Sequence, residues 1–438
     1  MTERLIALAD GHLLGEIRRD ARGRLSFEYD ASWSQDDAAY PLSLSMPLAV
    51  VNHGHDKIEP WLWGLLPDNE NVLARWARRF QVSARSAFSM LRATGEDCPG
   101  AVQLVRPERV GHLLASRSGG ESVPHVASEP REIVWLTTAE VEARLRTLRH
   151  DNSAWRLEED LGQFSLAGAQ SKTALLFRDG RWGIPHGVTP TTHILKPPIV
   201  GFPGHCENEY LCLALAETLG IPAARSVVSR FGQETTIVVE RYDRIATATR
   251  LARLHQEDLC QALARSPFNK YESEGGPGCG DIAIAIRSHC TRPGEDLRTF
   301  AKAIALNWVI GGTDAHARNF SLLIGAGGNA RLAPLYDLAS AVPYPGHYAP
   351  RLKLAMKIGG ESRIGYVQVR HWERFAGEVG LPPEEVLGIC KSVAAETPDR
   401  FADVVAAARS KGLDHPIMGR LKEEIAGNAK ACLAKLRK

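Results

Sequence analysis

Hydrophobic and polar residues alternate through the first thirty positions as they do in antiparallel strands. Apolar-rich runs at residues 5–9 and 12–17 are separated by Asp10 and Gly11. An Asp-Gly pair between two such runs favours a tight hairpin, because both central positions of that turn prefer positive φ. A second turn at residues 20–23 leads into another alternating run at 25–29. The chain is therefore predicted to begin with a small antiparallel sheet.

The pattern becomes helical from Pro60, where apolar residues recur at intervals of three and four. Residues 106–130 are rich in Gly, Ser, Pro and charge, which is typical of a linker. Thr137 and Glu140 then form a capping box that opens a helix. Further helices are predicted at residues 211–219, 254–261, 297–308, 383–395, 398–411 and 416–436. Strands are predicted at residues 174–177 and 235–239. Trp61, Trp63 and Trp76 are expected to lie in the core.

Composition narrows the class of protein. With 438 residues, 44% of them hydrophobic, the chain is expected to build two or three core-forming units. The net charge is only +2, so the overall charge of the protein does not favour nucleic acid or a membrane surface as its partner. The eight cysteines show no CxxC pair, and no stretch approaches a membrane span in length. Reduced thiols and a cytoplasmic location are expected.

Candidate chemistry lies in the catalytic loop, the name used here for residues 311–320 (GGTDAHARNF). Asp314 and Asn319 stand five positions apart in it, and Asp337 follows 18 residues later. A phosphoryl-transfer enzyme uses a carboxylate as base and oxygen ligands for a hard cation. An amide and a second carboxylate can provide those ligands. Alone, this spacing is more often an Asx turn, so support is needed from upstream.

That support comes from the Gly-rich loop, residues 165–172, whose small residues at 167–169 would let backbone N–H groups approach phosphate. Lys196 ends an apolar segment, where a kinase places the lysine that holds the α- and β-phosphates. The carboxylate that orients it is Glu207 or Glu209, at the start of the helix predicted over 211–219. The pattern leaves this choice open.

Taken together, these segments resemble the HipA-like family, the serine/threonine kinases of bacterial HipA–HipB toxin–antitoxin modules. The matching segments occur in order: SLAGAQSKTALLF (165–177), TPTTHILKP (189–197), ENEYLCLALAETLGI (207–221), VVERYDR (238–244), QEDLCQ (256–261), YESEGGPG (271–278), NWVIGGTDAHARNFSLLI (307–324) and PLYDLASA (334–341). ADGHLLGEI, GLLPDNE and GEDCPGAVQLV resemble the family's extra N-terminal subdomain.

The resemblance implies a two-lobed, protein-kinase-like α/β (α+β) fold. Its parts would be an N-terminal subdomain (1–110), a linker (111–130), a β-rich N-lobe (131–248) and an all-α C-lobe (249–438). Asp314 would be the catalytic base, and Asn319 and Asp337 would bind Mg²⁺. The residues implied to hold ATP are Leu166, Ala167, Gly168, Ala169, Gln170, Lys172, Lys196, Glu240, Tyr242 (through its backbone) and His316.

The resemblance also implies regulation and partners. Ser165 matches the serine that family members autophosphorylate to inactivate themselves, with Ser171 as the alternative. A phosphate there would add about −1.5 to −2 charge where ATP phosphates bind. The expected protein substrate is an aminoacyl-tRNA synthetase such as glutamyl-tRNA synthetase, whose modification stops translation and growth. The expected partner is a HipB-like helix-turn-helix antitoxin, through which any operator DNA is contacted.

Two alternatives stay open on the same scaffold. The catalytic parts do not specify the acceptor, so a small-molecule phosphotransferase would use the same residues. A DNA-bound co-repressor without kinase activity is disfavoured, because Lys196, Asp314, Asn319 and Asp337 are all present.

Overall fold

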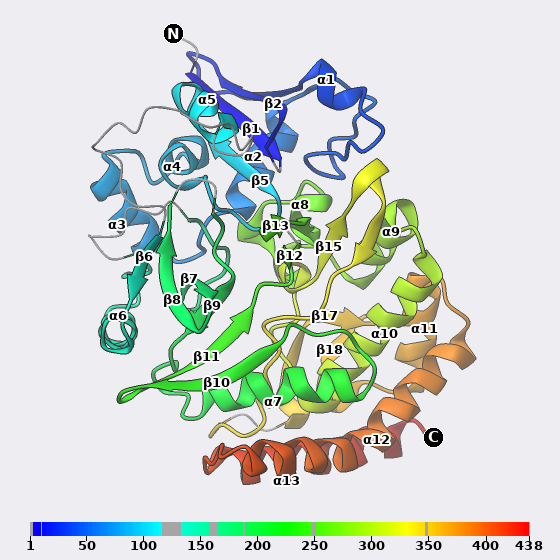
Figure 1. Ribbon diagram of the computed structural model, residues 1–438. Coiled ribbons are helices and arrows are strands. Elements are labelled where there is room, and N and C mark those ends of the chain that lie inside the picture. The colour runs from blue at the N-terminus through cyan, green and yellow to red at the C-terminus, as the bar shows by residue number, and fades with distance from the viewer. Residues whose placement is uncertain are drawn as a thin grey trace.

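The chain folds into an N-terminal unit followed by two lobes (Figure 1). Residues of all three parts line one cavity. The structure is a computed structural model and describes residues 3–9, 11–115, 133–156, 164–186, 189–247, 251–346 and 349–437. We call residues 3–115 the N-terminal unit, residues 133–247 the N-lobe and residues 251–437 the C-lobe. The two-lobed kinase-like fold is as expected from the sequence.

The N-terminal unit is built on a five-stranded antiparallel sheet in the order β4-β3-β2-β1-β5. The hairpin predicted around Gly11 is confirmed by the pairing of β1 with β2, although Asp10 lies outside the described residues. The strands are β1 (Glu3–Ala9), β2 (His12–Arg19), β3 (Leu25–Tyr29), β4 (Asn52–His53) and β5 (Val102–Val105).

Five helices complete this unit: α1 (Ala31–Ser34), α2 (His55–Gly64), α3 (Glu70–Phe80), α4 (Ala87–Thr94) and α5 (Pro107–Ala115). Helix α2 begins at His55, earlier than predicted, and includes Pro60. Trp61 and Trp76 are each 1% exposed and lie in the core, as predicted. Part of the predicted linker is helical, since α5 covers residues 107–115 and packs Leu113 beside β1; residues 116–130 lie outside the described residues.

The N-lobe carries a six-stranded sheet in the order β10-β11-β9-β7-β8-β6. Helix α6 (Thr138–His150) starts with the predicted capping box, because the Thr137 side chain accepts from the Glu140 N–H and Glu140 accepts from the Thr137 N–H. The other elements are β6 (Ile133–Leu136), β7 (Thr173–Arg178), β8 (Arg181–Pro185), β9 (His193–Lys196), α7 (His205–Thr218), β10 (Ser226–Phe231) and β11 (Glu234–Glu240).

The N-terminal unit and the N-lobe share one hydrophobic core. Trp155, Phe164 and Leu166 of the N-lobe pack in the same buried cluster as Trp61 and Trp76. Phe164 and Leu166 flank the start of the Gly-rich loop, so burial against the N-terminal unit holds that end of the loop in place.

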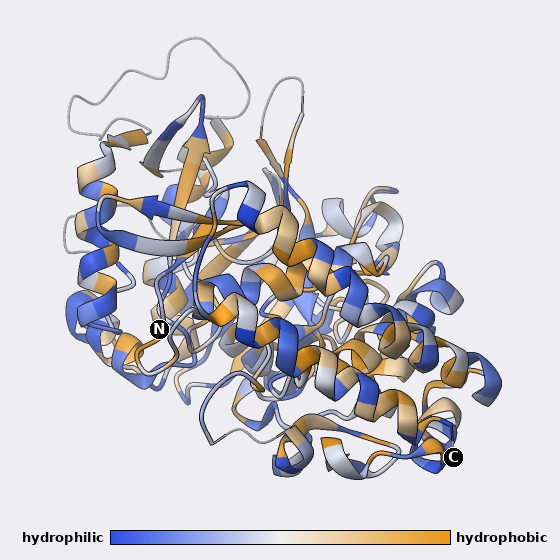
Figure 2. Ribbon diagram, turned by 90° about the horizontal axis from the view of Figure 1, so that it is seen from below, coloured by the Kyte–Doolittle hydropathy of each residue, from blue (hydrophilic) through white to orange (hydrophobic). Residues whose placement is uncertain are grey.

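The C-lobe is mainly helical. Its long helices contain both hydrophobic and hydrophilic residues (Figure 2), and their buried hydrophobic residues form one core. They are α9 (Cys279–His289), α10 (Pro293–Ile310), α11 (Val369–Val379), α12 (Pro383–Ser410) and α13 (Ile417–Lys435), with the short α8 (Leu259–Ala262) before them. The predicted break before Pro398 is wrong, because α12 runs through it. An internal proline costs about 3 kcal/mol, whereas each buried Phe or Val, such as Phe401 and Val405, returns about 1.5–3 kcal/mol.

The expectation of an all-α C-lobe needs one addition, since this lobe also contains short strands. They are β13 (Leu251–Arg253), which pairs with β12 (Arg244–Ala246) at the end of the N-lobe, β14 (His255–Asp258) with β15 (Ser321–Ile324) and β16 (Ala330–Leu332), and β17 (Lys353–Ile358) with β18 (Glu361–Arg363). Residues 255–258, predicted as the start of a helix, pair with β15 instead, and the helix covers only α8. Pairing with a distant strand outweighs the local helical pattern.

Two further observations concern the cysteines and the lengths of the helices. All eight cysteines lie among the described residues, and all are free and buried. None of the helices in the described part of the chain is both long and apolar enough to cross a membrane.

Candidate active site

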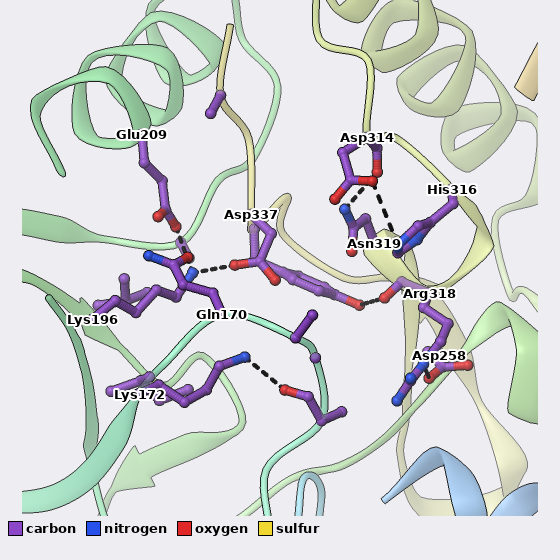
Figure 3. A pocket seen from close by; sticks show the side chains of 18 of the residues that line it. Gln170, Lys172, Lys196, Glu209, Asp258, Asp314, His316, Arg318, Asn319 and Asp337 are labelled. Carbon is purple, nitrogen blue, oxygen red and sulfur yellow. Dashed lines mark hydrogen bonds and ion pairs between the residues drawn. The ribbon is translucent and has the colours of Figure 1, made fainter. Parts of the chain in front are cut away.

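A cavity of about 580 Å³ opens between the N-terminal unit, the N-lobe and the C-lobe. This volume lies in the range of pockets that enclose small ligands. Every residue predicted to act as base or to hold nucleotide or metal lines this cavity, whereas Ser165 does not. Figure 3 shows Lys196 between Glu209 and Asp337, with Asp314, Asn319 and His316 grouped on the other side of Asp337.

Lys196, the last residue of β9, forms two buried ion pairs. Its Nζ lies 2.7 Å from Oε1 of Glu209 on α7 and also contacts Oδ1 of Asp337. Burial by itself would lower the pKa of Lys196, but the two carboxylates outweigh it and the pKa lies above its ordinary value. The choice that the sequence left open is decided: Glu209, rather than Glu207, faces the lysine.

Asp337 has a backbone conformation that few residues adopt. Its φ is +51°, in the left-handed region, where aspartate is tolerated better than most side chains. Burial would raise the pKa of its carboxyl, yet Lys196 and Lys172 hold that pKa well below its usual range. The carboxylate is thus charged and aimed into the cavity, and one oxygen remains beyond the Oδ1 that contacts Lys196.

The catalytic loop follows the end of α10 at Gly311, whose φ of +71° stops the helix. The Asp314 side chain is 67% exposed, so a large acceptor can reach it. Its Oδ1 accepts a hydrogen bond of 2.7 Å from the Tyr271 hydroxyl, and its carbonyl accepts one of 2.7 Å from Nδ2 of Asn319. Because the Asn319 nitrogen is used in this way, its amide oxygen is the atom left to ligate a cation.

His316 is buried against the catalytic loop. Burial lowers its pKa to about 4, so the imidazole is neutral at neutral pH. Its ring packs edge-on to Tyr271 with centroids 5.0 Å apart, and its buried Nδ1 has no hydrogen-bond partner in the structure. A buried polar atom without a partner at the edge of a cavity is suited to a ligand's polar group.

The Gly-rich loop bends over a second lysine. Lys172 Nζ donates to the Ala167 carbonyl at 2.6 Å and lies 5.2 Å from the centre of the Trp155 ring. Gly168 has φ +101°, and a Cβ there would approach Lys172 Nζ to 2.6 Å. Burial lowers the pKa of Lys172 to about 8. The loop therefore holds a partly desolvated cation beside Lys196.

The remaining predicted loop residues have different surroundings. Leu166 is 3% exposed and its side chain belongs to the core shared with the N-terminal unit. Ala169 lines the cavity, as does Gln170, whose Nε2 donates to the Pro197 carbonyl at 3.5 Å. Ser171 is partly exposed and its hydroxyl donates to the Asn152 carbonyl at 3.4 Å. Phosphate contacts from Leu166 would therefore come from its backbone.

The far end of the cavity lies at the connection after β11. Glu240 is exposed there, and the Tyr242 hydroxyl donates to Gln256 Oε1 at 2.7 Å while its ring stacks near Tyr336. Beneath this connection, Arg241 is paired with Asp97 of the N-terminal unit at 3.4 Å. The connection is thus fixed to the N-terminal unit by buried charge.

Sequence reasoning missed several residues of this site. Asp68, between α2 and α3, pairs with both Lys270 and Arg318. Arg318 also pairs with Asp258 at 3.1 Å. Tyr271, in a stretch that reads as a surface loop, contacts the predicted base. Arg318 was visible in the catalytic-loop motif, but no local pattern connects residue 68 with residue 318.

The donor set fits a magnesium ion that also binds nucleotide phosphates. Within the described residues, no group of three or more His, Cys, Asp and Glu side chains is arranged to hold a metal by itself. Mg²⁺ in phosphoryl-transfer sites is held by one or two protein oxygens together with phosphates and water. The Asp337 carboxylate and the Asn319 amide oxygen, both lining the cavity, provide such a set.

Comparisons with known proteins match two separate segments of the chain. Residues 5–105 match the model of the HipA N-terminal domain, and residues 164–401 match that of the HipA-like C-terminal domain. The chain is 34% identical over 422 residues to the candidate kinase Y4mE of Sinorhizobium fredii, covering 96% of each protein. It is 27% identical over 408 residues to the serine/threonine-protein kinase toxin HipA of Shewanella oneidensis, covering 90% of this chain and 87% of that one.

A solved structure has the same fold. It contains HipA, HipB and operator DNA from Shewanella oneidensis, and it matches this chain with a TM-score of 0.82 at 24% identity. The match covers 99% of this chain and 98% of the other. The fold is therefore common to both proteins over their whole length.

Proposed function

Because the chain belongs to the HipA family, we propose that it is an ATP-dependent serine/threonine-protein kinase acting as the toxin of a toxin–antitoxin module. The observation that carries the proposal is the arrangement across one cavity of Lys196, paired with Glu209 and Asp337, opposite Asp314 and Asn319. This is the set that protein kinases use to hold phosphates and to position the acceptor hydroxyl.

Asp314 serves as the base in this proposal. The acceptor hydroxyl oxygen attacks the γ-phosphorus of ATP, the bond to the β–γ bridging oxygen breaks, ADP leaves, and the hydroxyl proton passes to the Asp314 carboxylate. Exposure of the Asp314 side chain, at 67%, supports an acceptor carried on a protein surface. Tyr271 holds one carboxylate oxygen and leaves the other for the substrate hydroxyl.

The nucleotide lies along the cavity between the Gly-rich loop and the connection after β11. Lys196 and Lys172 bind its phosphates, and the loop backbone from Leu166 to Gln170 lies over them. Glu240 and the Tyr242 backbone bind the adenine, with His316 beside the nucleotide. The cavity contains all of these residues, which supports the assignment.

Magnesium would be held by the Asn319 amide oxygen and the Asp337 carboxylate. When bound, it neutralises phosphate charge and makes the γ-phosphorus a better electrophile. Asp337 needs Lys196 to keep its carboxylate charged, since burial alone raises its pKa. The ion pair between these residues therefore prepares the metal ligand as well as the phosphate site.

Autophosphorylation of Ser165 is proposed as the mechanism of inactivation, with Ser171 as the alternative acceptor. Ser165 is fully buried, so the Gly-rich loop has to leave its place before the hydroxyl can be modified. A phosphoserine could not return to that buried position, because the charge would lack a partner. Ser171 is more accessible but lies outside the core contact that this mechanism uses.

The proposed protein substrate is an aminoacyl-tRNA synthetase such as glutamyl-tRNA synthetase, whose phosphorylation would inhibit translation and cause growth arrest and persistence. The proposed partner is a HipB-like antitoxin, supported by the shared fold with the Shewanella oneidensis HipA in its complex with HipB and operator DNA. DNA would be contacted through that complex. A cytoplasmic location is proposed, favoured by eight free cysteines.

The first test is intact mass and peptide mapping of the full chain, expressed as the wild type and as Asp314→Gln. We expect one added phosphate, about 80 Da, on Ser165 of the wild type, and none on the variant. A wild type that stays unmodified after incubation with ATP and Mg²⁺ would contradict autoregulation. Labelled ATP in a cell lysate then separates the acceptor classes: label in a protein band supports the kinase, and label in a metabolite supports a small-molecule phosphotransferase.

A further inference from the structure

We propose that Asp68 of the N-terminal unit is a positioning residue for phosphoryl transfer, which holds the catalytic loop and the Gly-rich loop in their places around the cavity. This inference rests on the proposed kinase activity. It assigns to the N-terminal unit a part in positioning the catalytic groups, through a side chain that lines the cavity.

The Asp68 carboxylate binds two cations from the C-lobe. One oxygen contacts the Arg318 guanidinium, and the other accepts from Lys270 Nζ at 2.7 Å. Asp68 and Lys270 side chains are 18% and 16% exposed, and Arg318 is 3% exposed. Burial would raise the pKa of Asp68, but the two cations hold it below its ordinary value. The carboxylate is therefore charged where it contacts them.

The Arg318 contact fixes the backbone of the catalytic loop. Arg318 lies between Asp314 and Asn319, in a short 3₁₀ turn of residues 317–319. Its guanidinium contacts Asp68, donates to Asp258 at 3.1 Å and donates to the Gly64 carbonyl at 2.9 Å. A planar guanidinium held on several sides has little freedom. The loop that carries the base and a metal ligand is thus anchored to the N-terminal unit.

The contact of Asp68 with Lys270 also affects the position of Asp314, the proposed base. Lys270 precedes Tyr271, and the Tyr271 hydroxyl donates to Asp314 Oδ1 at 2.7 Å. Asp68 therefore holds the segment that orients one oxygen of the base. Both of its cations act on the position of Asp314.

The backbone of Asp68 binds the Gly-rich loop. Its N–H donates to the Gly168 carbonyl at 3.0 Å, and Pro67 and Gly168 form an isolated parallel bridge. Gly168 is the position whose missing Cβ makes room for Lys172. One residue thus contacts the loop above the phosphates and the loop that carries the base.

The charges around Asp68 determine how its replacement should change nucleotide affinity and the rate of transfer. Asp68 and Asp258 face Arg318 and Lys270, which gives two negative and two positive groups. Replacing Asp68 by Asn leaves one uncompensated positive charge beside the site of an anionic nucleotide. Nucleotide affinity should then stay or increase, while transfer slows because the catalytic loop and the Lys270–Tyr271 segment lose their ion pairs with this side chain. A general loss of folding would instead reduce both.

The test compares full-length wild type, Asp68→Asn, Asp68→Glu and the control Glu96→Gln. Glu96 is also a buried carboxylate of the N-terminal unit paired with an arginine, Arg109 at 2.5 Å, but it does not line the cavity. Single-turnover phosphate incorporation from γ-labelled ATP reports transfer, titration with a fluorescent ATP analogue reports binding, and thermal melting reports folding.

We expect Asp68→Asn to slow transfer by about tenfold to a hundredfold, with nucleotide Kd unchanged or lower. Asp68→Glu, which keeps the charge, should recover part of the rate, and Glu96→Gln should match the wild type. Transfer by Asp68→Asn within about twofold of the wild type would overturn the inference. If the asparagine variant does not fold, Lys270→Gln, which breaks one of the two ion pairs of Asp68, takes its place, and transfer by that folded variant at the wild-type rate overturns the inference equally. A wild type without any transfer refutes the proposed kinase itself.

Discussion

The Ser165 hydroxyl donates a hydrogen bond of 2.7 Å to the Leu65 carbonyl, and its side chain is completely buried. The Ser165 N–H also donates to the Asp97 carbonyl at 3.0 Å. The start of the Gly-rich loop is therefore part of the interface with the N-terminal unit. A charged group at this position is incompatible with the closed loop, because it would be buried without a counter-ion.

Ser165→Glu is expected to open the Gly-rich loop. The buried carboxylate would expel the loop and weaken nucleotide binding by about tenfold or more. Limited proteolysis should show faster cleavage within residues 164–172, and a fluorescent ATP analogue gives the affinity. Ser171→Glu is the matched control, since Ser171 is partly exposed and should change both measurements less. Equal effects of the two variants would contradict the burial argument.

The Glu209→Gln variant should lose transfer activity, because Lys196 loses one of the two carboxylates that fix it. A drop of about a hundredfold is expected for misplacement of a phosphate-binding group. Glu207→Gln on the same helix is the control and should stay near wild type. Single-turnover phosphate incorporation measures both, and a larger loss in the Glu207 variant would contradict the assignment of Glu209.

Nucleotide affinity should depend on pH through Lys172. Burial lowers the pKa of this lysine to about 8 in the free protein. Below that pH the ammonium is charged and attracts phosphate; as pH rises through it, the charge is lost and affinity should fall by about tenfold. Arginine stays charged, so Lys172→Arg should remove the inflection. Titrations between about pH 6.5 and 9.5 test this, and an identical inflection in the variant would assign it to another group.

Stability should fall as pH rises because of Glu257, which accepts from the Leu44 N–H and is fully buried. Burial raises the pKa of its carboxyl from 4.5 to about 8. Between these two pH values the folded state keeps a proton on Glu257 that the unfolded state releases. The contribution of this proton to the stability of the folded state is therefore complete below pH 4.5, and it is lost as the pH rises through about 8.

Glu257→Gln is neutral at every pH and should lack this dependence. The free energy of unfolding of the variant minus that of the wild type should be roughly 2–4 kcal/mol more positive at about pH 9 than at about pH 5. Denaturant unfolding at both pH values measures it. A constant difference would show that Glu257 titrates at its ordinary pKa.

The parts of the site that depend on local chemistry were predictable from the sequence. Small residues around Gly168 mark a loop that allows close backbone approach, and Lys196 ends an apolar strand. The spacing of Asp314 and Asn319 fixes their separation along one short loop. These signals arise within a few neighbouring residues, so they persist whatever the rest of the chain does.

Other features required the folded molecule. The choice of Glu209 over Glu207 depends on how α7 turns against β9, since both residues lie in the first turns of one helix. The continuity of α12 through Pro398 depends on burial against neighbouring helices, which outweighs a local cost.

The contribution of the N-terminal unit to the site was the least predictable. Asp68 and Arg318 are 250 positions apart, and Asp97 meets Arg241 across 144. The amino acid types show that these side chains carry charge, but partners are chosen by packing, because a buried charge is stable only beside an opposite one. The sequence by itself thus determined which side chains are candidates for the chemistry, and the tertiary structure decided which of them meet.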